Sequence, residues 1–223
     1  MFAPDPIETS IVKKYKKNIW HRFIKAGREY KLINDGDRIL CVLRGDAQSL
    51  LFAKCFERLK KYSETQFELA FVSADSPHES FGLDAALTAD PWGFARAQGF
   101  NKLALPDCFD DCIEYILASQ LYEGRLQALT PAQDTGGLTI VRAGLLIRRE
   151  DIAAFARYNS LSLPITAAKA DERTLRVRQI IEELAKTNKN LEINILRSCE
   201  EVNLETVISY TEGGVRKSIL DTF

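Results

Sequence analysis

The chain has 223 residues, 46% of which are hydrophobic, and its formal net charge is only −1. This length and apolar content suit one large α/β domain with a short appendage, and the charge excludes a polycation along the whole chain. No apolar run approaches the roughly 18 residues that a membrane-spanning helix needs, and residues 1–10 lack the apolar stretch of a signal peptide. We therefore expect a cytoplasmic protein without a membrane partner.

The cysteines indicate a reducing compartment. Their number is odd and their spacing is irregular, which argues against a fully disulfide-paired secreted scaffold. Cys41 and Cys55 fall within apolar patterns and are expected in the core. The five are Cys41, Cys55, Cys108, Cys112 and Cys199.

Residues 1–36 are predicted to form a basic amphipathic helix. Ile11, Tyr15, Ile19 and Phe23 recur at four-residue spacing, with cations between them. Residues 1–31 hold eight Lys/Arg against three acids. These cations either contact RNA phosphates or form a solvated surface on a helix that packs against the domain. No feature points to DNA. The candidate RNA-binding residues are Lys13, Lys14, Lys16 and Lys17.

Residues 37–160 are predicted to form an α/β domain. Nearly continuous apolar strands alternate with helices, which is the pattern of a parallel sheet buried on both faces. Gly36 separates this domain from the basic helix, and residues 161–223 are expected to form a helical C-terminal region. The predicted strands lie at 38–43, 67–73, 101–105 and 138–142, and the helices that follow the first three lie at 46–61, 91–98 and 109–122.

The turn RGDAQS (44–49) lies where a phosphate site would form. Ligands of parallel sheets bind at the carboxyl ends of the strands, and a helix that follows a glycine-containing turn presents free N–H groups there. Neither a Walker loop nor a G-x-G-x-x-G fingerprint is present. The turn is therefore either a plain strand-to-helix connection, with Asp46 in the first helical turn, or an altered phosphate cradle in which Arg44 partners an anion.

Three longer stretches together resemble one family. They are RILCVLRGDAQSLLFAKCFERLKK (38–61), KLALPDCFDDCIEYILASQLYEGRLQALTPAQ (102–133) and LTIVRAGLLIRREDIAAFARYN (138–159). In order and spacing they resemble the PP-loop ATPase superfamily, and within it the tRNA 2-thiocytidine synthetase-like branch. The resemblance implies a Rossmann-like adenine-nucleotide-binding fold and a tRNA partner. It also implies a reaction in which ATP adenylates a tRNA cytidine before a sulfur donor attacks.

The first family motif, S-G-G-K-D-S, is only partly kept. Arg44, Asp46, Ala47 and Gln48 replace four of its residues. The carboxylate of Asp46 is expected to repel a phosphate, because it stands where backbone should approach the anion. The nucleotide-binding remnant that the resemblance implies consists of Arg44, Gly45, Asp46 and Ser49, with Arg142 from the family's later I-R-P-L motif.

The second family motif, A-L-G-H-H-x-D-D-x-x-E-T, keeps its acids but loses its histidines. Pro106, Asp107 and Cys108 stand at the Gly-His-His positions. Asp107 is expected to cap the following helix. Alternatively, Cys108 and Cys112 could share a metal with Asp111. The retained acids, which would hold magnesium or act in the active site, are Asp110, Asp111 and Glu114.

Thiolating members of the family also carry a C-x-x-C pair and a downstream cysteine, and this chain has no cysteines at those places. We therefore expect no iron–sulfur cluster, and ATP with magnesium bound weakly at most. No residue is assigned a catalytic role. The leading hypothesis is a degenerate PP-loop protein without thiolation activity that keeps weak nucleotide or tRNA binding. Two alternatives stay open: an active ATP-dependent tRNA-modifying enzyme with altered residues, and a regulatory or structural partner of a complete paralogue. Because family members commonly self-associate, a homodimer is expected.

Overall fold

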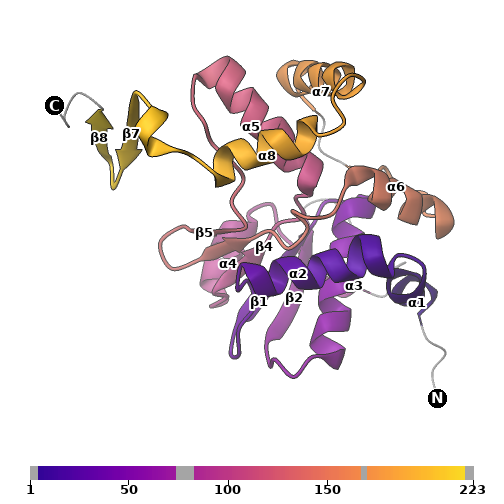
Figure 1. Cartoon of the computed structure of the whole chain (residues 1–223). Coiled ribbons are helices and arrows are strands. Elements are labelled where there is room, and N and C mark those ends of the chain that lie inside the picture. The colour runs from indigo at the N-terminus through magenta and orange to yellow at the C-terminus, as the bar shows by residue number, and fades with distance from the viewer. Residues whose placement is uncertain (1–4, 74–82, 167–169, 219–223) are drawn as a thin grey trace.

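A six-stranded sheet forms the centre of the protein. The structure is a computed structural model, and it describes residues 5–73, 83–166 and 170–218. The strand order is β3-β2-β1-β4-β6-β5, in which β5 is antiparallel to β6 and all other neighbours are parallel (Figure 1). The prediction of an α/β fold with a mostly parallel sheet is therefore confirmed. The strands are β1 (Arg38–Leu43), β2 (Glu68–Ser73), β3 (Ala85–Leu87), β4 (Lys102–Ala104), β5 (Ala132–Asp134) and β6 (Thr139–Val141).

Helices precede, connect and follow these strands. The three helices predicted after the first three strands are present within one or two residues of their expected bounds. The described α-helices are α1 (Pro6–Lys13), α2 (His21–Glu29), α3 (Ala47–Tyr62), α4 (Pro91–Ala97), α5 (Phe109–Glu123), α6 (Arg149–Tyr158), α7 (Glu172–Ala185) and α8 (Leu191–Glu200).

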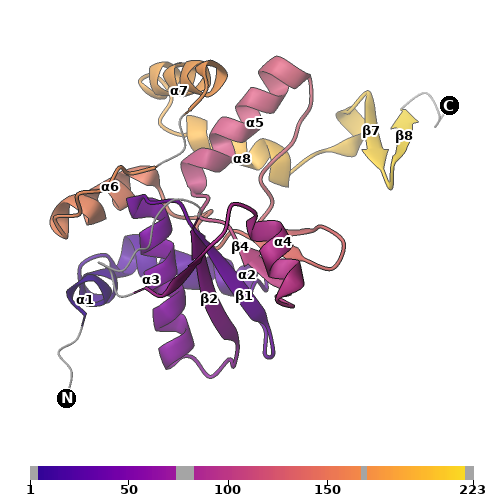
Figure 2. The same cartoon turned by 180° about the vertical axis from the view of Figure 1, so that it is seen from behind.

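The two faces of the sheet are covered by different helices. Alternate side chains of β1 point to opposite faces. Ile39 and Cys41 join a large core with the N-terminal helices, α3 and α6. Leu40 points the other way, into a smaller core with Ala95 of α4. Figures 1 and 2 show α2 and α4 on opposite sides of the sheet. Burial of both faces explains why the strands contain so few polar residues.

The N-terminal segment is not one continuous α-helix, as was predicted for residues 1–36. A π-helical turn at Lys16–Trp20 joins α1 to α2, and the backbone N–H groups of Tyr15, Trp20 and His21 donate to carbonyls five residues earlier. The predicted apolar face is nevertheless confirmed, because the four side chains that define it are all buried: Ile11, Tyr15, Ile19 and Phe23.

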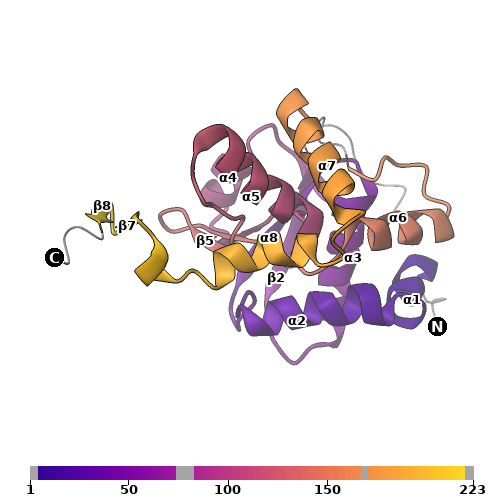
Figure 3. The ribbon, with the colours of Figure 1, turned by 45° about the horizontal axis from the view of Figure 1, so that its top comes forward.

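A second layer lies over the carboxyl ends of the parallel strands. It consists of α5, α7 and α8, which share a small core containing Phe109, Ile113, Val177 and Ile181 (Figure 3). Because the turns after β1 and β4 open toward this layer, it covers the edge of the sheet where the candidate site lies.

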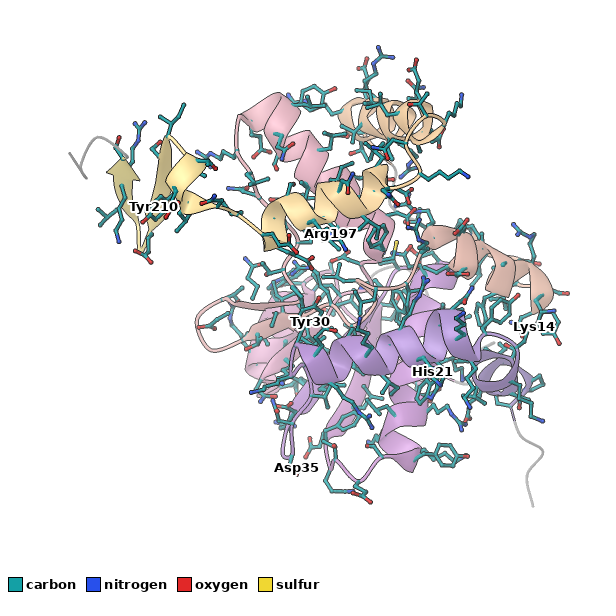
Figure 4. The ribbon with its side chains drawn as sticks, in the orientation of Figure 1. Lys14, His21, Tyr30, Asp35, Arg197 and Tyr210 are labelled. Atoms are coloured by element: carbon teal, nitrogen blue, oxygen red, sulfur yellow. The ribbon has the colours of Figure 1, made fainter. Side chains whose placement is uncertain are left out.

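The C-terminal region is not helical throughout. A short 3-10 helix, Leu204–Thr206, leads into a two-stranded antiparallel sheet of β7 (Ser209–Glu212) and β8 (Val215–Ser218). Its tight turn uses Gly213 and Gly214, both with positive φ. This hairpin, which carries Tyr210, lies to one side of the body (Figure 4). None of the described helices is long and apolar enough to cross a membrane.

Candidate functional site

The turn after β1 is held by hydrogen bonds within the RGDAQS segment. Gly45 adopts a positive φ of 71°, which allows the chain to reverse into α3. Asp46 is the N-cap of α3, and its Oδ1 accepts a hydrogen bond from the Ser49 N–H at 2.6 Å. The Ser49 hydroxyl oxygen in turn accepts one from the Arg44 N–H at 3.0 Å. Asp46 therefore takes the capping position that a plain strand-to-helix turn would give it.

The first N–H groups of α3 are already bonded to another part of the chain. The Ala47 N–H donates to the Pro164 carbonyl at 2.9 Å, and the Gln48 N–H donates to the Ile165 carbonyl at 3.2 Å. Free N–H groups at a helix N-terminus are what bind a phosphate. We call Pro164 and Ile165 the strap, because these residues cross the helix end and take up donors that an anion would need.

Two arginines meet at one carboxylate beside this turn. Arg142 is buried, and its Nε donates to Oδ2 of Asp107 at 2.9 Å. Arg44 approaches the same carboxyl group, with 3.5 Å between its Nη1 and Oδ1, and also lies 3.5 Å from Asp46 Oδ2. Burial raises the pKa of Asp107, although the Arg44 and Arg142 guanidinium groups act in the opposite direction. The two cations assigned to the nucleotide remnant are thus partly neutralised within the chain.

Gln48 links the first motif to the second. Its side chain is fully buried, and its Nε2 donates both to the Pro106 carbonyl at 2.5 Å and to Asp111 Oδ2 at 2.6 Å. Asp111 Oδ2 also accepts from the Cys108 N–H at 2.8 Å, which closes a capping box at the start of α5. The expected N-cap, Asp107, is therefore wrong by one residue, since Cys108 occupies that position.

The retained acids of the second motif form a network with arginines. Arg149 donates to Asp111 Oδ1 at 2.6 Å and to Glu114 Oε1 at 2.5 Å, while its backbone N–H donates to Asp110 Oδ2 at 2.7 Å. Arg178 of α7 adds bonds of 2.9 and 3.0 Å to the two oxygens of Glu114. This network joins α5, α6 and α7. The carboxylates of the network therefore already accept hydrogen bonds from Arg149 and Arg178.

The surroundings of Asp110 and Asp111 shift the pKa values of these adjacent residues in opposite directions. Burial raises the pKa of Asp110, despite the opposing hydrogen bond from the Arg149 N–H. Burial acts in the same direction on Asp111, but Arg149 and the hydrogen bonds from Cys108 and Gln48 outweigh it and hold the pKa below its usual range. Asp111 is thus the member of the pair that is stabilised as a carboxylate.

The structure gathers most of the sequence-predicted site residues at one edge of the sheet. Arg44, Gly45, Asp46 and Ser49 follow β1, Arg142 follows β6, and the three acids lie in the first turns of α5. The lysines are elsewhere: all four are exposed, and Lys14 Nζ lies 4.1 Å from the centre of the Tyr158 ring in α6. Sequence reasoning named Gln48 and Asp107 as replaced motif residues but missed their roles as partners within the site. It missed Arg149, Arg178 and the strap altogether, although Arg149 lies within the quoted stretch 138–159.

The cysteines lie apart from this network, except at the start of α5. Cys41, Cys55, Cys108 and Cys112 are buried, and Cys199 is half-buried. Burial raises the pKa of each of these thiols, to about 11 for Cys112. Within the described residues, no group of three or more His, Cys, Asp or Glu side chains is placed to hold a metal ion. Cys108, Cys112 and Asp111 therefore do not form the metal site considered as an alternative.

The parallel sheet and the turn between β1 and α3 place the chain among α/β proteins with a nucleotide-binding type of fold. No protein-family model matches it. The chain is 25% identical over 241 residues to a tRNA-cytidine(32) 2-sulfurtransferase of Geotalea daltonii, with 88% of this chain and 94% of the relative covered. It is 26% identical over 235 residues to the protein of that name in Geobacter sulfurreducens, with 85% and 91% covered.

A solved structure has the same fold. The U34-tRNA thiolase NcsA from Methanococcus maripaludis, determined with its [4Fe-4S] cluster, superposes with a TM-score of 0.62 at 13% identity, covering 81% of this chain and 76% of that one. Together with the sequence relatives, this match supports a relation to the PP-loop ATPase tRNA thiolases. The resemblance inferred from the motifs is confirmed at that level.

This match corrects one expectation. The absence of an iron–sulfur cluster was expected, and the finding that a thiolase of the same fold carries a [4Fe-4S] cluster, together with the five cysteines of this chain, contradicts it. The expectation relied on two cysteine positions of one family branch, which are too narrow a basis for excluding the cofactor. Among the described residues, Cys112 and Cys199 lie close together, but no three ligating side chains do, so they offer no cluster site from which a reaction step could be derived.

Proposed function

We propose that this chain is a tRNA-binding relative of the tRNA 2-thiolation enzymes that lacks thiolation activity and binds ATP weakly. The observation that carries the proposal is the strap. Two donors at the start of α3 are bonded to Pro164 and Ile165, and a third bonds to Asp46 within the turn. A triphosphate would have to displace these partners before it could use the helix end.

The charges around the turn support weak ATP binding. Arg44 and Arg142 share Asp107, and Arg44 also lies near Asp46. An anion that approached these arginines would compete with carboxylates already held at short distance. Separation of a buried ion pair leaves a poorly solvated charge behind, so this competition favours the protein's own acids.

The acids expected to hold magnesium are engaged in the same way. Asp111 and Glu114 bond to Arg149, and Glu114 also bonds to Arg178. A divalent cation would have to replace one or both guanidinium groups, and Mg²⁺ prefers to keep several of its waters in an open octahedral site. The geometry therefore supports a structural role for these carboxylates.

The tRNA part of the proposal rests on the N-terminal lysines and on the relatives. Four exposed lysines lie between the end of α1 and the π-helical turn, where they can neutralise phosphates: Lys13, Lys14, Lys16 and Lys17. The sequence relatives are tRNA sulfurtransferases by name. Binding of this kind should be salt-sensitive and largely independent of sequence. Self-association stays a prediction, to be checked by light scattering.

The test measures tRNA binding by the full chain, using fluorescence anisotropy at a series of salt concentrations. Reversal of the four lysines to glutamate should weaken binding and lower the log–log salt slope by about 0.7–0.9 for each lost phosphate contact. The matched control reverses four exposed cations at the C-terminal side: Arg173, Arg176, Lys186 and Lys189. If this control lowers the slope as much as the lysine reversal does, the N-terminal helix is not the tRNA site.

A further inference from the structure

A groove lies between α2 and the end of α3. Its volume is about 600 Å³, and its floor is apolar, with Phe23, Ile24 and Leu59. Tyr62 ends α3 just before β2, and Asn34 lies just before β1, so the groove is at the amino edge of the sheet. It is therefore separate from the site at Arg44–Ser49, which follows the carboxyl end of β1. Asp35, labelled in Figure 4, marks the amino edge.

Tyr62 is an exposed aromatic side chain on one wall of this groove. Its exposed fraction is 59%. The Arg58 guanidinium lies 4.4 Å from the centre of its ring and 5.6 Å from that of Trp20, so Arg58 is held between two aromatic rings. The Lys61 ammonium lies 5.1 Å from the Tyr62 ring. Cations stacked on an aromatic ring stabilise its position while it remains in contact with solvent.

The opposite wall carries cations without partners of opposite charge. Arg28 and Lys31 line the groove, and both are exposed. In the part of the chain that the structure describes, neither forms an ion pair, and the same holds for Lys60 near the end of α3. Glu64 is the acidic residue of the lining. The groove thus combines a net positive charge with an exposed ring.

We propose that this groove binds a single-stranded segment of RNA, with a base stacked on Tyr62 and phosphates bound by Arg28 and Lys31. The inference rests on the proposed tRNA binding and adds a second contact site to it. An aromatic platform beside backbone-neutralising cations is what unpaired nucleotides require, since their faces are free to stack. The paired bases of a duplex are already stacked on each other, so a duplex would gain only the charge contacts.

The experiment compares labelled single-stranded RNA with a duplex of the same sequence, by fluorescence anisotropy with the full chain. Tyr62→Ala should weaken single-strand binding about tenfold or more, because stacking supplies that much per base. Tyr62→Phe should keep most of the affinity, and duplex binding should change little in both variants. The matched control is Tyr122→Ala, because Tyr122 is 44% exposed, lies 5.5 Å from Arg173 and lines a groove on α7.

A second measurement tests the position of the RNA. Ultraviolet crosslinking of a uridine-containing single strand, followed by mass spectrometry, should map to Tyr62 or to the chain around it. Crosslinks confined to other surfaces would overturn the proposal, as would equal losses in Tyr62→Ala and Tyr122→Ala. The failure of the proposed function has a different outcome: wild-type protein would then bind no tRNA at all. If it binds tRNA, responds to the lysine reversal and is unaffected by Tyr62→Ala, only the groove proposal fails.

Discussion

The backbone N–H of Ala47 donates to the carbonyl oxygen of Pro164 at 2.9 Å, so a segment after α6 completes the first turn of α3. The neighbouring bond from Gln48 to Ile165 repeats the arrangement. Because both bonds use main-chain atoms, a side-chain change in the turn does not remove them. Restoring the side chains of the family motif would therefore leave these two N–H groups bonded to the strap.

The first prediction concerns ATP. Wild-type protein should bind ATP·Mg²⁺ poorly in calorimetric titrations. Restoration of the family residues, by Arg44→Ser, Asp46→Gly, Ala47→Lys and Gln48→Asp together, should raise the affinity only slightly while the strap is in place. Addition of Ile165→Gly, which removes an apolar side chain packed on the core, should raise it further by loosening the strap.

The controls for this test are Ile165→Gly alone and titration with AMP, which lacks the β- and γ-phosphates. Wild-type binding near micromolar, about 8 kcal/mol, that the restored variants weaken would show that the turn is adapted to a ligand as it stands.

The second prediction concerns the arginine–carboxylate network. Arg149→Met should destabilise the fold by about 3–5 kcal/mol, because it leaves Asp111 and Glu114 short of a partner where the Glu114 side chain is only 8% exposed. Urea unfolding followed by circular dichroism measures the loss. In the control, Lys25→Met breaks an exposed pair with Glu29 and should change stability by less than about 0.5 kcal/mol. Equal effects of the two substitutions would contradict a stabilising role for the network.

The third prediction concerns pH. The pKa of Asp111 is lowered in the folded state, so its charge contributes stability above the ordinary carboxyl pKa, and this contribution is lost as the pH falls through the folded value. The stability advantage of wild type over Asp111→Asn should therefore stay level from about pH 7 to about pH 5 and shrink as the pH falls below about pH 4.

The control is Asp110→Asn, because the pKa of Asp110 is shifted in the opposite direction to that of Asp111. The pKa of Asp110 is raised, so the contribution of its titration is present at low pH and is lost as the pH rises through the folded value. The stability of Asp110→Asn relative to wild type should improve as the pH rises. The same pH trend in both variants would show that the environments of the two carboxylates are not distinguished as described.

The fourth prediction concerns thiol reactivity. Cys199 is half-buried, whereas the other four cysteines are buried, so Cys199 should react first with iodoacetamide under native conditions. Cys112 should stay protected near neutral pH, because burial raises its pKa to about 11 and the thiolate is the reacting form. Peptide mass spectrometry after timed quenching measures the order, and Cys199→Ser is the control. Earlier labelling of Cys112 would contradict the packing of α8 over α5.

The sequence was sufficient for the parts of the fold that periodicity encodes. Apolar runs located four of the five parallel strands within one or two residues, β3 being the one missed, and the spacing of Ile11, Tyr15, Ile19 and Phe23 identified the buried helix face. Edge strand β5 was missed because its sequence, AQD, is polar and wholly exposed. The hairpin β7–β8 was missed for a similar reason, since it has few apolar residues and no alternation strong enough to indicate a strand.

The site was predictable in location but not in its contacts. Motif order placed Arg44, Asp110 and Arg142 at one edge of the sheet, because parallel strands end there together. The strap could not be predicted, since a main-chain hydrogen bond from Ala47 to Pro164 depends on where two distant segments meet and leaves no trace in residue type. The sharing of Asp107 by two arginines likewise depends on side-chain geometry across three loops.

The π-helical turn at Lys16–Trp20 determines how the N-terminal segment tolerates insertions and deletions. In an uninterrupted α-helix, Ile11 and Phe23 would point about 120° apart, because four-residue steps drift from the 3.6-residue period. The turn accommodates about one extra residue and recovers about 100° of that drift, so both side chains reach the core with 1% exposure or less. Loss of a single residue here would let the segment close into a regular α-helix, in which Ile11 and Phe23 would point only about 20° apart and Ile11 would stay on the core side. We therefore expect relatives whose N-terminal segment is one residue shorter to lack the π-helical turn. In such relatives, one of the four-residue steps between apolar residues should be a three-residue step.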